Sequence, residues 1–197
     1  FDVEAVLQNV RSEVLVPGQV LSSKSMALSA NSTEIQIFGD GTLSGIPFSG
    51  IWSQSLKVPQ LASQVVASME LSAASLKALN VEVPSGAIDG KAIANLTLQM
   101  FEKEPVLFEF SSNLKGLSLN VSPLKWQKPR SLLGEINVKG AFSKPITIDS
   151  FVFRAPGLSA KGKINFEASG LKSIFISDLT VGEWLSAEAK LPSRGVG

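Results

Sequence analysis

The residues that could do chemistry in this chain are few. Glu102 and Glu104 are closely spaced carboxylates, but they stand in a polar stretch just before Pro105, so we expect a solvated turn rather than an acid–base pair. Asp40 lies in Gly39-Asp40-Gly41, which is typical of a turn and has no following helix that could bind phosphate. The sequence has no His and no Cys, so imidazole bases, thiolate nucleophiles and thiolate zinc sites are excluded. No serine stands in a G-x-S-x-G motif. The sequence therefore predicts neither an enzyme nor a cofactor or metal site.

One short segment surrounds an aromatic residue with cations. We expect this segment, Lys125-Trp126-Gln127-Lys128-Pro129-Arg130, to form either a plain loop anchor or a contact with lipid headgroups. The predicted interface residues are Lys125, Trp126, Lys128 and Arg130. The other two tryptophans, Trp52 and Trp184, are predicted to fill a core or its rim, with a border of an apolar groove as the alternative.

The overall composition favours apolar over charged surfaces. Hydrophobic residues make up 44% of the 197 residues and charged residues only 18%, below the roughly 25% of ordinary globular domains. The formal net charge is +1, and no basic stripe is present, which argues against nucleic acid as a partner. No apolar run approaches the ~20 residues of a membrane-spanning helix. We expect a piece of a larger protein.

The elements that must position these residues are strands, because the dominant period is two. From Gly86 to Met100 apolar and small residues alternate with polar ones, which predicts one long strand with a dry face and a wet face. The same alternation recurs in residues 106–111, 117–121, 134–142 and 158–168, and less cleanly in 33–45, 47–57, 62–71, 146–154 and 171–181. The apolar positions that we expect on a common dry face are Ile88, Leu96, Leu98, Phe108, Phe110, Leu117, Ile136, Val138, Leu158, Ile164 and Phe166.

Turns and one helix connect these strands. Ser72 is a suitable N-cap for a short helix over residues 72–79, and Pro47, Pro105 and Pro145 each open a predicted strand after a polar turn. The sequence thus predicts an all-β antiparallel fold with one short helix. Residues 1–191 form a single segment, with residues 1–32 the least clearly patterned and residues 192–197 as a loop or tail. A barrel, a sandwich and a curled trough are all compatible with such a pattern.

Several short motifs resemble one known family. The stretches 83–92, 111–120, 123–129, 155–162 and 181–184, in this order, are similar to strand and loop motifs of the AsmA-like proteins of the Gram-negative envelope, YhdP type. The resemblance covers roughly residues 33–190 and implies a highly curved, amphipathic sheet that forms an elongated trough with an apolar lining.

The same resemblance implies a function. It implies an internal periplasmic segment of an inner-membrane-anchored protein that moves phospholipid between the membranes, and it carries over no catalytic residue. Its partners would be acyl lipid, adjacent segments of the same protein and other envelope proteins. The alternative is a structural or adhesive β-sandwich or barrel with a closed core and no ligand. A polysaccharide-active enzyme would need convergent carboxylates, which the sequence does not place.

Overall fold

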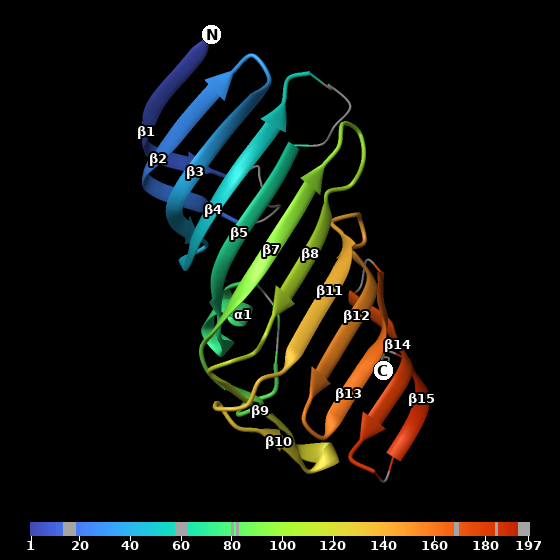
Figure 1. The fold of residues 1–197 in the computed structure, drawn as a ribbon. Coiled ribbons are helices and arrows are strands. Elements are labelled where there is room, and N and C mark those ends of the chain that lie inside the picture. Colours follow the sequence, from blue (N-terminus) through green and yellow to red (C-terminus); the bar gives the residue numbers. More distant parts are fainter. Residues whose placement is uncertain are drawn as a thin grey trace.

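The chain forms one large antiparallel sheet, shown in a computed structural model that describes residues 1–13, 19–57, 63–79, 81, 83–167, 170–183 and 185–192 (Figure 1). Twelve strands lie side by side, and their spatial order follows the chain. They are β1 (Asp2–Ser12), β2 (Leu21–Asn31), β3 (Glu34–Leu43), β4 (Ile46–Ser55), β5 (Ser63–Leu71), β7 (Ala92–Met100), β8 (Leu107–Ser112), β11 (Glu135–Ala141), β12 (Thr147–Ala155), β13 (Leu158–Glu167), β14 (Gly170–Val181) and β15 (Leu185–Pro192). Residues 193–197 and Trp184 lie outside the described residues.

A second, smaller sheet lies at one end of the strands. It has three strands in the order β10 (Trp126–Lys128), β9 (Leu117–Val121) and β6 (Ile88–Gly90). The helix α1 (Ala73–Ala78) lies at the same end, which is the lower end in Figure 1. Within the described part of the chain α1 is the one α-helix, and no helix there is long and apolar enough to span a bilayer.

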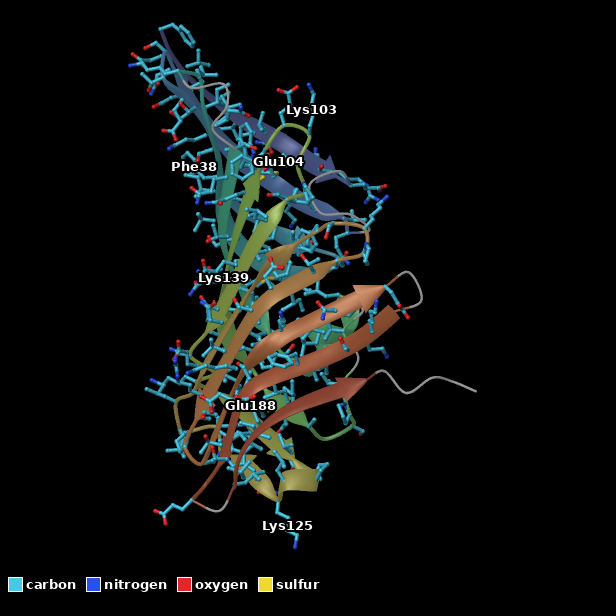
Figure 2. The ribbon with its side chains drawn as sticks, turned by 90° about the vertical axis from the view of Figure 1, so that its right-hand side faces the viewer. Phe38, Lys103, Glu104, Lys125, Lys139 and Glu188 are labelled. Carbon is cyan, nitrogen blue, oxygen red and sulfur yellow. The ribbon has the colours of Figure 1, made fainter. Side chains whose placement is uncertain are left out.

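The large sheet is curved and not closed. β1 and β15 are its edge strands and do not pair with each other. In Figure 1 the lower halves of β1 and β2 turn behind β3 and β4, and Figure 2 shows both ends of the sheet turning away from the side that bears Phe38 and Lys139. The expectation of an all-β, curved antiparallel sheet with one short helix is confirmed. Of the three architectures that the pattern allowed, the closed barrel is absent.

Cross-strand pairing assigns each side chain to one face. Residues directly opposite each other in an antiparallel ladder point to the same side of the sheet. Ala67 of β5 is opposite Leu96 of β7, which is opposite Phe110 of β8, and all three point to the concave face. Their chain neighbours Val66, Thr97 and Ser111 point to the convex face. The alternation in the sequence is therefore the alternation between these two faces.

A closed core occupies the lower end of the concave face. There, α1 and the small sheet pack on the strand ends and bury Leu43, Met69, Ala94 and Leu117, with Leu76 of α1 packed against them. As predicted, Ser72 caps α1: its hydroxyl accepts from the Ser75 amide at 3.2 Å, and its own amide donates to the Ser75 hydroxyl at 2.7 Å. This reciprocal capping box stabilises a helix of only six residues.

The prediction of a single strand from Gly86 to Met100 is wrong. Residues 88–90 belong to the small sheet, and the chain enters the large sheet only at Ala92. The corner lies at Gly90, which has a φ of +93°, a backbone conformation that glycine adopts readily and other residues rarely do. In addition, a Cβ at this position would collide with the carbonyl oxygen of Gly116. Alternation continues through the corner, which hides it from sequence analysis.

The turn predicted at Asp40 is also wrong, because Asp40 lies inside β3. In addition, the poorly patterned residues 1–32 contain two 11-residue strands, β1 and β2. Both errors concern the strongly bent N-terminal end of the sheet, where glycine and serine replace larger residues.

The corner at Gly90 yields a test of stability. Replacing Gly90 by Ala adds both the strain of a positive φ and the collision with Gly116, so the free energy of unfolding should fall by more than about 2 kcal/mol. Gly86→Ala is the matched control, because Gly86 also has a positive φ (+75°) but has nothing within 4 Å of the added methyl group. Urea denaturation of both variants measures the difference. Equal losses would mean that the contact with Gly116 does not hold the corner.

Candidate functional site

An uninterrupted apolar row crosses the concave face. Its members are directly opposite each other on successive strands, so they form one line perpendicular to the strands. With strands about 4.8 Å apart, the row is roughly 50 Å long. From β1 to β14 it contains Ala5, Leu28, Ile37, Trp52, Val65, Leu98, Phe108, Gly140, Ile148, Ile164 and Ile174.

Charge is confined to the other face. In the large sheet, we assigned each described and paired strand residue to one face from its register. None of those assigned to the concave side is Asp, Glu, Lys or Arg. The convex side carries directly opposed ion pairs: Glu109–Lys139 at 3.0 Å, Glu135–Arg154 at 2.8 Å and Lys161–Asp178 at 3.4 Å. Hydrogen bonds from Asn137 and Lys139 lower the pKa of Glu109. The described residues contain no group of carboxylates that could hold a metal ion.

Nine of the eleven residues predicted for the dry face lie on the concave side of the large sheet. They are Leu96, Leu98, Phe108, Phe110, Ile136, Val138, Leu158, Ile164 and Phe166. Most are half-buried, whereas Leu98 and Leu158 are buried. The remaining two, Ile88 and Leu117, belong to the small sheet and pack into the closed core, where Leu117 is fully buried. Leu158, although on the concave side of the large sheet, is buried against Trp126 and Val181. The assignment of Ile88, Leu117 and Leu158 to a groove surface is therefore corrected.

A cavity of about 450 Å³ is hollowed into the N-terminal half of the concave face. Of the predicted residues only Leu96 and Leu98 line it. The lining residues are Leu7, Val10, Ser12, Leu21, Met26, Ile37, Leu43, Phe48, Gly50, Ile51, Trp52, Ser63, Val65, Ala67, Met69, Leu96, Leu98 and Met100. Trp52, predicted to fill a core or its rim, thus borders an apolar hollow.

Small residues create this hollow. A second row parallel to the apolar row contains Gly39, Gly50 and Ala67 on β3 to β5 before it reaches the larger Leu96 and Phe110. Three successive positions without a large side chain leave space above the sheet. The sequence signal was this run of small residues at cross-strand positions, which becomes visible only when the strand register is known.

The bent ends of β1 and β2 form the opposite wall. The register between β2 and β3 shifts between Ser22 and Ala27, and the chain bends there. The hydroxyl of Ser23 donates to the carbonyl oxygen of Asp40 at 2.6 Å and so fixes the bend. Met26 is buried and lies close to Gly39. Leu7, Val10 and Met26 consequently face the floor residues across the cavity.

The predicted headgroup-contacting segment is mostly internal. Trp126 is buried, its indole nitrogen donates to the Pro156 carbonyl oxygen at 2.9 Å, and its ring meets Phe153 edge-on with 5.8 Å between centroids. Lys128 is 1% exposed, and its ammonium donates to the carbonyl oxygens of Leu114 at 2.7 Å and Leu117 at 2.8 Å. These two side chains are therefore not available to a headgroup, because they hold the small sheet together.

The two other members of that segment are at the surface. Lys125 ends a 3₁₀ turn in the left-handed conformation and points into solvent at the tip of the small sheet (Figure 2). Arg130 is exposed and pairs with Asp89 of β6. Arg130 thus joins the two sides of the small sheet rather than facing outward alone.

Comparison of the whole chain with known protein families, with curated proteins and with solved structures gave no match.

Lys128 provides a test of how the small sheet is held. Its burial lowers the pKa of its ammonium group below the ordinary value of about 10.4. Lys128→Met keeps the chain length but removes the donor to Leu114 and Leu117, so the free energy of unfolding at pH 7 should fall by about 1–3 kcal/mol. Urea denaturation measures the loss, and exposed Lys125→Met is the control.

The same variant carries a pH signature. Between the lowered pKa and about pH 10.4 the unfolded chain binds a proton at this side chain that the folded chain has released. Wild-type stability should therefore rise relative to Lys128→Met as the pH increases through this window. A stability difference that stays constant from pH 7 to pH 10.5 would contradict the assignment of the pKa shift to Lys128.

Proposed function

We propose that this chain is a lipid-conducting segment of a larger envelope protein, in which the concave face receives the acyl chains of phospholipid. The observation that supports this function is the apolar row, which crosses the strands from β1 to β14 without a charged or hydrogen-bonding side chain other than the Trp52 indole. Each methylene group removed from water contributes about 0.8 kcal/mol. An acyl chain that moves along the row exchanges one apolar neighbour for the next and is not returned to water.

The open sheet supports the same proposal. A sheet whose apolar face is filled by the side chains of a packed sandwich leaves no room for a ligand on that face. Within the described residues, α1 and the small sheet cover the lower strand ends and the bent strands β1 and β2 face the cavity, whereas Phe108, Val138 and Ile164 remain half-buried. A partly exposed apolar face of this extent is typical of surfaces that bind lipid or another apolar partner.

The location of the protein is part of the proposal. The motifs that resemble AsmA-like proteins suggest the periplasm, as part of an inner-membrane-anchored protein, with adjacent segments of that protein and other envelope proteins as partners. The ion pairs on the convex face of β8 to β14 suit a segment surrounded by water, whereas the convex face of β3 to β5 also exposes Phe38 and Val66. The absence of charge from the concave face suits the tails of phospholipid more than their headgroups.

Paired substitutions on β13 test the proposal. Ile164→Asp places a carboxylate in the apolar row, whereas Asn165→Asp places the same group on the next residue, which points to the convex face and is exposed. Phospholipid retained after purification should fall at least tenfold in Ile164→Asp and stay unchanged in Asn165→Asp. Lipid extraction followed by mass spectrometry measures both, and circular dichroism confirms folding. Equal retention by the two variants, or no lipid on the wild-type protein, would contradict the proposed function.

A further inference from the structure

The cavity has a floor, a wall and one closed end. Its floor is β4, β5 and β7, and its opposite wall is formed by Leu7, Val10 and Met26 of the bent strands. At the lower end, Leu43 and Met69 line the cavity and also belong to the buried core beneath α1 and the small sheet. Among the described residues, Ser63 and Met100, which lie opposite each other at the upper end, belong to no buried core. The cavity is therefore a blind recess that runs along the strands.

The length of this recess follows from strand geometry. Ser63 and Met69 are six residues apart on β5, which corresponds to about 20 Å at ~3.3 Å per residue. An extended chain advances roughly 1.2 Å per bond, since a peptide unit of three bonds spans ~3.3–3.6 Å. The recess is thus as long as roughly 16 carbon–carbon bonds.

The volume gives the same answer independently. A methylene group is about the size of a water molecule, whose share of liquid volume is about 30 Å³. A cavity of about 450 Å³ then holds roughly 15 methylene groups. Length and volume agree on one acyl chain of ordinary length.

The chemistry of the lining determines the orientation of the ligand. Ser12, Ser63 and the Trp52 indole are the only polar side chains among the lining residues, and none of the lining residues is charged. An ionised headgroup has no partner in the recess, and its burial there would be strongly unfavourable. The chain end must therefore point toward Met69, with the polar group outside the upper end.

From these observations we propose that the recess is a binding site for a single acyl chain, and that Met69 and Leu43 form the end-stop that sets the longest chain it can enclose. This inference rests on the proposed function, because the recess is part of the same concave face. Beyond the proposed function, the inference is that one acyl chain is bound at a fixed place between β1 and β7, in addition to any binding along the apolar row.

A series of saturated fatty acids from 10 to 20 carbons tests the site, with affinities measured by native mass spectrometry below the concentration of micelle formation. Affinity for the wild-type protein should rise about fourfold for each added methylene and level off near 16 carbons. Met69→Ala lengthens the recess, so the plateau should move to longer chains by two or three carbons. Ala67→Phe fills the recess and should reduce binding of the 16-carbon acid at least tenfold.

Controls separate this site from the rest of the trough. Val66→Phe adds the same ring on the opposite face of β5 and should leave the whole series unchanged. If Ala67→Phe does not fold, two other results test the site. Ala67→Leu should weaken binding of the 16-carbon acid, and Met69→Ala should shift the plateau to longer chains. Val138→Asp disrupts the concave face on β11, far from the recess, and should leave the plateau where it is.

Three outcomes have distinct meanings. A plateau that shifts in Met69→Ala and binding that is lost in Ala67→Phe support the site. A different result would contradict the acyl-chain site but not the proposed function. In that case affinity increases with chain length without a plateau, Ala67→Phe has no effect, and Val138→Asp abolishes binding. A wild-type protein that binds no fatty acid of any length contradicts both.

Discussion

Curvature allows this sheet to keep one face apolar in water without a complete second layer. A flat sheet of twelve strands would expose the whole of its apolar face, at about 25 cal/mol for each Å². Turning both ends toward the same side brings the apolar residues of distant strands nearer to one another and leaves them half-buried. The small sheet and α1 complete this arrangement at the lower end, where they bury a compact core.

Glycines opposite phenylalanines accompany this curvature. Gly140 is opposite Phe108, Gly162 is opposite Phe151 and Gly41 is opposite Phe48, and in each pair a Cβ on the glycine would lie within about 3 Å of the ring. The ring therefore occupies the space that the glycine leaves and covers its backbone. Register shifts occur beside Gly140 and Gly162, where an additional residue bends the strand. One residue type thus provides both the bend and the space for the aromatic ring that covers it.

Most of the strands could be predicted from the sequence, because one-sided burial forces a period of two. The strands β3 to β5, β8, β9 and β11 to β14 correspond to predicted segments within a few residues, whereas β10 lies in a segment that was predicted to be a loop. The break at Gly90 could not be predicted, since the small sheet buries the same alternate positions as β7. β2 was missed because its many Ser and Ala residues give no strong contrast between apolar and polar positions, and β1 was missed because Val6 interrupts the polar positions of its alternation. The recess depends on Gly39, Gly50 and Ala67 being opposite each other, and this depends on a register that no local pattern contains.

The buried Lys128 was predicted to be at an interface, because its neighbours in sequence are basic, whereas its neighbours in space are backbone carbonyl groups.

The covered lower end makes the two rims of the trough different. Along the strands, the concave face meets packed protein at the lower end, whereas the described residues form no second core at the upper end. Displacement from strand to strand, in contrast, is perpendicular to that axis and follows the apolar row. The surface is therefore polar in the directional sense along its strands and uniform across them, so the two axes of the same face differ in symmetry.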